Sequence, residues 1–576
     1  MKNFWFLAVA TVLLAGCSKS DTGSAPPTDN SAPIPAMVAD TVYTNGRIYT
    51  VNELQPWVEA VAIKDGTFLV VGSNADVKAA AGETTQVVDL AGAFAMPGLI
   101  DIHTHPSMSM NFRVFCELPG SFFLPNDEMT VAALKDCIDN YPADQKWFFA
   151  EGYSSPVMKP ETLTREFLDE LFGDRPAYIK DESGHFGFAN SKAFELAGID
   201  ENTPDTPDAF FSRREDGTPA GQIFEGGMNP FEELILPLAP EISQTAKLRL
   251  LDDATKSGIT ATGDAYVFEH DLPDWQKFVR EGRLNLHTRL YIQGNFGTGV
   301  INTPASEILR YYQEYELPGA PGVKMSMGGA LESRTEPMLK DAYIVDGSDI
   351  QPLIDVEMFT AYMKELDAAG IQAKVHAIGD GAVRATIDGF IAAIDERGSN
   401  ELRHHIDHCN YIQPEDMTRV VNKGIPCSAW PMLGAPIDFI TAQAEIIKPE
   451  AYKRGLPLRD MLDAGIMAAN HSDAPQANLW PWWGMEATLT RGFPAHPEID
   501  KFNEDQAITL EETLRVHTIN GAYVMLLDDV TGSIEVGKYA DMIVLNHSLF
   551  EIPQTDIHKT EVVRTIFKGN IVHQSD

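Results

Sequence analysis

The sequence predicts an α/β fold: a (β/α)8 TIM barrel that carries a small β-sandwich made from both chain ends and a large insertion after the first barrel strand. Two observations predict it. Short apolar segments alternate with helical patterns through the middle of the chain, and both ends are rich in strand and turn signals. The eight candidate barrel strands are 99–103, 259–263, 286–292, 323–327, 371–377, 402–408, 425–430 and 466–471.

The candidate barrel domain spans residues 96–515. Glycine follows several of its helical segments, as at Gly258, Gly370 and Gly465, which is where helices commonly end. Eight βα units within about 400 residues leave room for one long insertion. We place it at about residues 110–250, between the first and second strands, and expect it to cover the mouth of the barrel.

The two parts of the predicted sandwich are residues 40–95 and 516–576. In the first part, Asn45-Gly46 and Asp65-Gly66 each separate two strand-like segments, which is a strong hairpin signal. In the second part, strand patterns cover 540–545, 562–567 and 571–573. A half-domain at each end predicts that the two ends meet beside the barrel.

Residues 1–17 have the form of an export signal. Lys2 precedes an apolar run too short to remain as a spanning helix, and the run ends in small residues and Cys17. This ending resembles the bacterial lipobox, which implies lipidation of Cys17 and a membrane anchor facing the periplasm. Ser18 then favours the outer membrane. The alternative is an ordinary signal peptide with an incidental cysteine. Residues 18–39 are polar and proline-containing, as a flexible tether would be.

The charge balance limits the partners of the chain. The formal net charge is −39 at pH 7, so nucleic-acid phosphates would be repelled, and we predict no nucleic-acid partner. We expect a small-molecule substrate. The sequence leaves the oligomeric state open, a homodimer included.

Four cysteines follow Cys17, namely Cys116, Cys137, Cys409 and Cys427. Export permits disulfides, but no two of these cysteines form a CxxC pair. Their pairing therefore stays open, and buried free thiols are an equal alternative.

The strongest local motif is His103-Thr104-His105, which ends the first candidate barrel strand. Side chains two positions apart on a strand share a face, so both imidazoles point the same way. They do so at the carboxyl end of a barrel strand, where active sites lie. Two neutral imidazoles on one face can hold a transition metal.

Four more polar residues lie at the ends of later candidate strands: Lys324, His376, His408 and Asp473. Each alone is more often structural than functional. Together they are hard to explain as core packing, because polar groups buried without partners are costly. The joint pattern predicts a metal site at the barrel mouth.

These motifs together resemble the amidohydrolase superfamily, and specifically its family 3 or YtcJ-like branch. The resemblance runs from about Ala39 to the C-terminus. The segments that carry it are 44–50, 97–106, 183–186, 329–335, 375–380, 406–408, 472–475 and 532–541.

By this resemblance, His103, His105, His376 and His408 are metal ligands, and Asp473 binds metal and acts as general base on an activated water. The implied cofactor is a divalent metal such as zinc, as one ion or two. Histidine and carboxylate donors suit such an ion.

Three further residues are assigned roles by the resemblance. Lys324 matches a position that is carboxylated in related enzymes and then bridges two metals; the alternative is a lysine paired with a carboxylate. His185 would polarise a substrate carbonyl, or else be structural. Arg334 would bind a substrate carboxylate, or equally hold its own loop.

The implied activity is hydrolysis of a carbon–nitrogen bond in a non-peptide amide, an N-acyl compound or a cyclic amide. An isomerase or lactonase on the same metal site is one alternative, and a non-catalytic lipoprotein that binds small molecules is another. The chain departs from the usual family residues at Ser183, Gly328, His405 and His471. These changes leave the proposed ligands intact and the substrate undetermined.

Overall fold

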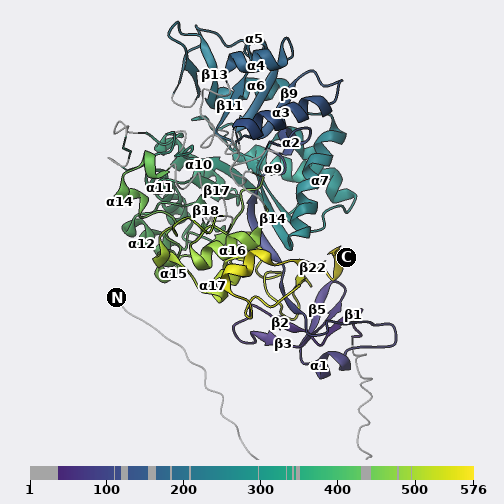
Figure 1. The fold of residues 1–576 in the computed structure, drawn as a ribbon. Helices are drawn as coiled ribbons and strands as arrows, with labels where there is room; N and C mark the ends of the chain where they lie inside the picture. Colours follow the sequence, from purple (N-terminus) through teal and green to yellow (C-terminus); the bar gives the residue numbers. More distant parts are fainter. Residues whose placement is uncertain are drawn as a thin grey trace, which may run out of the picture. The chain divides into compact units, whose positions relative to one another are not determined.

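A computed structural model describes residues 37–575, apart from 109, 119–126, 154–163, 182–183, 207–208, 296–297, 332–333, 340–342, 345–349, 430–442, 476–478 and 495. Residues Val38–Asp576 form one compact unit (Figure 1). The predicted export signal, Cys17 and most of the predicted tether lie outside the described residues. No helix in the described part of the chain combines the length and the apolar character needed to cross a bilayer.

Eight parallel strands form the central sheet, and all eight predicted barrel strands are present in it. They follow one another in chain order around the sheet. A parallel bridge between Thr104 and Ala474 joins the ends of the first and last strands, so the sheet nearly closes as a barrel. The strands are β8 (Leu99–Thr104), β14 (Ile259–Val267), β15 (His287–Gln293), β16 (Gly322–Ser326), β17 (Gln372–Ala377), β18 (His405–His408), β19 (Cys427–Ala429) and β20 (Ala468–Asn470).

The helices between these strands bury one apolar face against the outside of the barrel. Trp275, Phe359 and Phe390 are fully buried there against strand residues such as Leu290 and Val375. The main helices that follow the strands are α7 (Pro240–Lys256), α8 (Leu272–Arg280), α9 (Ala305–Glu314), α10 (Val356–Ala368), α11 (Asp380–Arg397), α12 (Pro414–Lys423), α15 (Leu458–Ala464), α16 (Pro481–Thr490), α17 (Leu510–Val516) and α18 (Ile519–Val524).

Two further sheets form the sandwich, and the second contains strands from both chain ends. The first has the order β5-β4-β1-β6, and the second has the order β23-β22-β21-β7-β2-β3. Strand bounds are β1 (Thr41–Thr44), β2 (Arg47–Tyr49), β3 (Trp57–Val58), β4 (Ala60–Lys64), β5 (Thr67–Gly72), β6 (Gln86–Asp89), β7 (Phe94–Pro97), β21 (Met542–Leu545), β22 (Val562–Phe567) and β23 (Asn570–Gln574). The antiparallel pairing of β7 with β21 joins the two ends of the sequence.

One of the two predicted hairpins is confirmed and the other is wrong. Asp65-Gly66 turns β4 back onto β5, and both residues have positive φ. At Asn45-Gly46 the chain also turns, but β1 pairs with β4 and β6, whereas β2 pairs with β3 and β7. The chain therefore crosses from one sheet to the other. Tyr43 and Ile48 enter the same apolar core from these two different sheets.

The insertion forms a separate five-stranded sheet with its own helices. Its strands are β9 (Phe148–Tyr153), β10 (Ala177–Asp181), β11 (Phe186–Ala189), β12 (Ala209–Arg213) and β13 (Pro219–Glu225), in the order β12-β13-β11-β10-β9. Its helices are α2 (Met110–Arg113), α3 (Asp127–Asn140), α4 (Arg165–Phe172), α5 (Ser191–Ala197) and α6 (Asn229–Ile235). Several of its described aromatic residues, Phe148 and Phe149 among them, are buried in the apolar clusters of the insertion.

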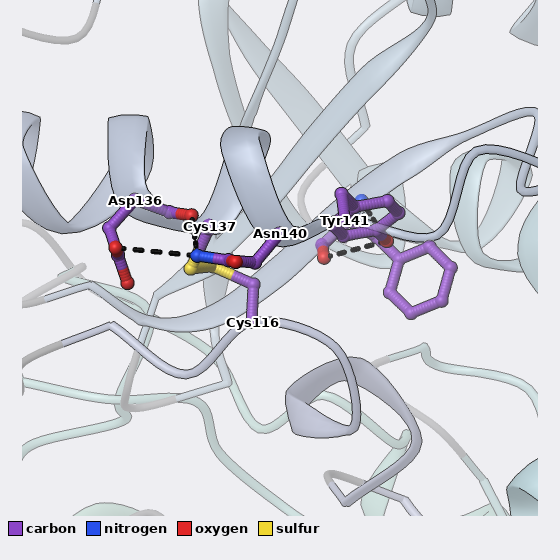
Figure 2. The surroundings of a disulfide bond; sticks show 6 residues. Cys116, Asp136, Cys137, Asn140 and Tyr141 are labelled. Atoms are coloured by element: carbon purple, nitrogen blue, oxygen red, sulfur yellow. Dashed lines mark hydrogen bonds between the residues drawn. A yellow bond between two sulfur atoms is a disulfide. The ribbon is translucent and has the colours of Figure 1, made fainter.

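A disulfide links Cys116 to Cys137 within the insertion (Figure 2). It ties α3 to the segment that leads from the first barrel strand into the insertion. Cys409 and Cys427 remain buried free thiols, with their sulfur atoms 3.4 Å apart. The question of pairing that the sequence left open is thereby answered for these four cysteines.

We expect the double substitution Cys116→Ser/Cys137→Ser to destabilise the insertion by about 3 kcal/mol, because the bond closes a loop of 21 residues in the unfolded chain. Differential scanning calorimetry of the oxidised wild type and the variant would measure this as a lower melting temperature. Reducing agent should bring the wild type to the variant's melting temperature and leave the variant unchanged. Equal melting temperatures under oxidising conditions would contradict this expectation.

Candidate metal centre

The two histidines of the His-x-His motif lie side by side at the end of β8. Their Nε2 atoms are 3.1 Å apart, and both side chains are at least nine-tenths buried. The alternation along the strand that predicted a shared face is therefore observed.

Asp473 completes this cluster from the other side of the barrel closure. One of its carboxylate oxygens, Oδ1, lies 3.0 Å from the Nε2 of both His103 and His105. The carboxylate is placed by the backbone, because the amide N of Asp473 donates to the carbonyl of His103 at 3.0 Å. Asp473 also has a φ of +62°, a left-handed conformation that is uncommon for a residue other than glycine and is often found at functional sites.

The other ring nitrogen of each histidine lies close to an oxygen atom. Nδ1 of His105 lies 2.7 Å from the carbonyl oxygen of Ala265, and Nδ1 of His103 lies 2.9 Å from Oδ2 of Asp407. With a proton on each Nδ1, each Nε2 would direct its lone pair toward the cluster. Metal-binding histidines are oriented in the same way by carbonyl and carboxylate partners.

This arrangement fits a divalent transition metal. Two imidazole nitrogens and a carboxylate oxygen, all acceptors, converge to about 3 Å and would repel one another unless a cation or a proton lay between them. Burial lowers the pKa of His105 to about 4, which keeps that ring neutral, as a ligand must be. Burial alone would raise the pKa of Asp473, but His103 and His105 hold it well below its usual range.

A second group of nitrogen donors adjoins the first. Nδ1 of His408 lies 3.1 Å from Nε2 of His471, and donor atoms of these two residues and of His103 also lie close enough to share an ion. Burial lowers the pKa of both His408 and His471 well below the usual value. His103 thus belongs to both donor groups.

His376 lies in the same pocket but outside both groups. Its ring centre is 4.4 Å from that of His408, and its Nε2 lies 2.8 Å from the carbonyl oxygen of Gly329. A proton on Nε2 would therefore be donated to this carbonyl. The predicted role of His376 as a ligand stays a prediction.

Lys324 lines the same pocket and is paired with Asp407. Its Nζ is 2.5 Å from Oδ2 of Asp407, the same oxygen that faces Nδ1 of His103. Both side chains are fully buried. Burial lowers the pKa of Lys324, whereas the pKa of Asp407, which burial alone would raise, is held well below its usual value by Lys324 and Lys374. This contact corresponds to the second sequence interpretation, a lysine paired with a carboxylate; carboxylation of Lys324 stays a prediction.

The insertion supplies one wall of the pocket. Gly184, His185, Glu225 and Met228 line it together with the barrel residues His103, His105, Met108, Tyr266, Lys324, Ser326, His376, His408 and Asp473. Nδ1 of His185 lies 3.0 Å from Oε2 of Glu225. Burial lowers the pKa of His185, but the charge and hydrogen bond of Glu225, together with the charges of Asp181 and Asp473, outweigh burial and raise the pKa. His185 is therefore placed where it could act as a hydrogen-bond donor to a substrate.

Arg334 is exposed and is not among the described residues that line this pocket. Its amide donates to the carbonyl of Leu331 at 3.0 Å, within its own loop. Its predicted role in binding a substrate carboxylate stays a prediction.

Three residues of this centre were not assigned roles from the sequence: Asp407, Glu225 and His471. Asp407 adjoins His408, and strict alternation would place the two on opposite faces. His408 has a φ of +70°, which breaks the alternation and lets both contact the barrel interior. Glu225 is far away in the sequence, on the last strand of the insertion, so no local spacing could have identified it. His471 was noted only as a departure from the family pattern.

A buried acid also lies behind the pocket, on β14. Asp264 is fully buried and accepts a hydrogen bond of 2.6 Å from Oγ of Ser107, which itself accepts from Nε1 of Trp275 at 3.0 Å. Burial raises the pKa of Asp264 to about 8, with a smaller contribution from the nearby Asp271. The group is neutral in the folded protein at mildly acidic pH.

Asp264 should therefore make the fold less stable as the pH rises. The pKa of Asp264 in the folded protein lies above its unfolded value of 3.8. Its contribution to the free energy of unfolding is therefore fully present below about pH 4 and is lost as the pH rises to about 8. We expect Asp264→Asn to become progressively more stable than the wild type over this window, by up to about 1.4 kcal/mol per pH unit. Urea unfolding at pH 5 and pH 8 would measure this. The exposed Asp500→Asn should show no such trend, and a parallel pH dependence of wild type and Asp264→Asn would disprove the assignment.

Comparison with known proteins identifies the family. The sequence model described as Amidohydrolase family matches residues 86–573, which is most of the chain. The chain belongs to the amidohydrolase family. This match confirms the resemblance deduced from the motifs, and membership in the family supports metal-dependent hydrolysis in general.

Full-length relatives agree with this placement. The chain is 26% identical over 551 residues to the YtcJ protein of Bacillus subtilis, covering 92% of this chain and 99% of that protein. It is 25% identical over 547 residues to the N-substituted formamide deformylase of Arthrobacter pascens, covering 92% and 98%. An uncharacterized metal-dependent hydrolase from Pyrococcus horikoshii has the same fold, with a TM-score of 0.69, 22% identity, and coverage of 89% and 99%.

Proposed function

We propose that this amidohydrolase cleaves the C–N bond of a small non-peptide amide, such as an N-acyl compound or a cyclic amide. One observation carries the proposal: Nε2 of His103, Nε2 of His105 and Oδ1 of Asp473 converge within 3.0–3.1 Å at the bottom of a pocket. A relative of full-length similarity is named for the deformylation of N-substituted formamides, which is cleavage of this type.

His103, His105 and Asp473 would hold the metal, which we propose is zinc. Such an ion supplies Lewis acidity and lowers the pKa of water in the site. His408 and His471 would provide nitrogen donors for a second ion, and a carboxylated Lys324 would add oxygen donors to the site. His376 would join the ligands if its ring released the Gly329 carbonyl.

Asp473 would take the proton of the attacking water and return it to the leaving nitrogen. Its low pKa keeps it ionised and able to accept a proton. His185 would stand on the opposite wall, with a pKa raised by Glu225, and donate a hydrogen bond to the substrate carbonyl. Negative charge that develops on the carbonyl oxygen would thus meet a donor from the insertion.

A panel of uncharged amides would test the reaction class. Purified full-length protein, with its metal content determined by elemental analysis, would be assayed with N-substituted formamides, anilides, cyclic amides and matching lactones. Cleavage of amides with kcat/KM at least tenfold above that for the lactones would support the proposal. A preference for lactones, or isomerisation without net hydrolysis, would replace it with one of the two alternatives on the same metal site.

We also propose that the protein is exported and anchored in the outer membrane through a lipid on Cys17, facing the periplasm. The disulfide between Cys116 and Cys137 supports an oxidising compartment, since such bonds rarely persist in the cytosol. Metabolic labelling with a fatty acid should mark the wild type and leave Cys17→Ser unlabelled. Equal labelling of both would refute the anchor.

A further inference from the structure

Hydrogen bonds through Glu225 join the wall of the metal pocket to the barrel. The Glu225 side chain is only 3% exposed, and its two carboxylate oxygens contact two different parts of the molecule. Oε2 lies 3.0 Å from Nδ1 of His185, in the insertion, and a carboxylate can only accept, so this Nδ1 donates. Oε1 accepts a hydrogen bond of 2.5 Å from Oγ1 of Thr335, which lies between β16 and α10 of the barrel.

The backbone holds Glu225 beside His185. β11 and β13 pair antiparallel as far as Phe186 and Phe224, and the amide of Glu225 then donates to the carbonyl of His185 at 2.9 Å. β13 ends at Glu225, where φ is +47° and ψ is −129°, a conformation that is uncommon for a residue other than glycine. Such conformations persist where the surrounding contacts determine them, and they gather at functional sites.

The hydroxyl of Thr335 is oriented by its own segment of the barrel. The amide of Ala330 donates to Oγ1 of Thr335 at 3.0 Å. The hydroxyl proton meets the Glu225 carboxylate at 2.5 Å and the carbonyl of Ala330 only at 3.5 Å, so it is donated to Glu225. Gly329 leaves room for this contact, because a Cβ there would overlap the Thr335 hydroxyl and lie 2.5 Å from Oε1 of Glu225.

His185 is the end of this network that adjoins the pocket. It lines the pocket, its side chain is 20% exposed, and its ring centre is 5.5 Å from that of His376. With Nδ1 bound to Glu225, a substrate would meet the ring at Nε2. A carboxylate held at both oxygens cannot rotate without breaking a hydrogen bond, and it therefore restricts the orientation of the ring.

We propose that Thr335 and Glu225 are positioning residues for His185. Thr335 fixes the carboxylate of Glu225, and the carboxylate fixes the imidazole ring. A segment of the barrel thereby determines how a residue of the insertion meets the substrate. The inference rests on the proposed function, in which His185 donates a hydrogen bond to the substrate carbonyl.

A double-mutant cycle tests whether Thr335 acts through His185. Thr335→Val removes the hydroxyl at nearly constant volume, and we expect kcat for the best amide of the panel to fall about tenfold, with KM changed less than about threefold. In a His185→Ala background the same substitution should change kcat less than about twofold. An equal loss of kcat in both backgrounds would overturn the proposal, because the effect would not pass through His185.

Further variants distinguish positioning from a merely structural role. Thr335→Ser restores the hydroxyl and should recover most of the activity that Thr335→Val loses; no recovery in a folded Thr335→Ser protein would count against the hydrogen bond. Glu225→Gln offers one acceptor oxygen in place of two, so it should lose at least as much activity as Thr335→Val, again only while His185 is present. If Thr335→Val does not fold, Glu225→Gln carries the same cycle. The exposed changes Thr418→Val and Glu233→Gln are the matched controls and should behave as the wild type does.

NMR of the purified full-length protein with isotope-labelled histidine measures the network without turnover. The N–H signal of His185 Nδ1 is identified by its absence in His185→Ala. We expect this signal to move in Thr335→Val and in Glu225→Gln, and to stay in place in the two control variants. An unmoved His185 signal in both Thr335→Val and Glu225→Gln would overturn the network, whatever the enzyme hydrolyses. Moved signals in a wild-type protein that hydrolyses no amide would support the network and refute only the proposed function.

Discussion

Replacing Asp473 by asparagine is expected to lower the rate of amide hydrolysis by about a thousandfold or more, because the variant cannot accept a proton from water. The amide is nearly the same size as the carboxylate, so the packing around His103 and His105 should survive. However, asparagine carries no negative charge, and its NH2 group could face the two Nε2 lone pairs. The site would then attract a cation less strongly. Part of the metal should therefore also be lost.

The measurement is kcat on the best amide of the panel, with the metal content of each sample determined in parallel. Assays in excess metal distinguish the two causes of lost activity. Added metal can restore the activity lost with the ion, but it cannot restore the activity lost with the general base. Asp505→Asn, an exposed change of the same kind, is the matched control and should retain full activity. If Asp473→Asn keeps at least a tenth of the wild-type activity, Asp473 is not the general base. If the wild type binds small molecules but turns none of them over, the non-catalytic alternative is favoured.

The second large effect is expected for His103→Ala/His105→Ala, which should bind less than about a tenth of the metal that the wild type binds. Two of the three converging donors are removed, and the remaining carboxylate alone holds a transition metal weakly. Hydrolysis should fall to background.

Elemental analysis of dialysed wild-type and variant protein would show this directly. His270→Ala/His573→Ala removes two imidazoles away from the pocket lining and should keep the wild-type metal content. A folded wild-type protein that binds no metal even after supplementation would contradict the metal centre itself. Two ions per chain in the wild type would favour the use of His408, His471 and a carboxylated Lys324.

The barrel could be predicted because its strands are short, apolar and separated by helices with clear ends. Gly424 and Gly465, for example, adopt the left-handed conformation that follows a helix. The strand ends were less accurate: β14 continues to Val267, past the predicted end at Gly263, and β18 begins only at His405. Where a strand starts and ends depends on how far its neighbouring strand extends for pairing. The local sequence pattern does not contain this information.

The metal centre could be predicted only where its residues follow regular backbone. His103 and His105 obey the two-residue period of a strand and were predicted to share a face. Asp407 was missed because the backbone at His408 is left-handed, so that neighbouring side chains reach the same interior. Glu225 was missed because it approaches His185 through the pairing of β13 with β11, an association between distant segments.

The sheet that mixes both chain ends has a consequence for how the polypeptide acquires its structure. β7 is hydrogen-bonded on one side to β2 and on the other to β21, which is synthesised long after β7 itself. Until then Phe94 and Met96 are apolar residues on a strand that lacks one of its two neighbours. Contacts of such long sequence separation are slow to form, and the early segment is prone to aggregate while it waits. Covering β7 until β21 has been synthesised should therefore reduce aggregation of the unfinished chain.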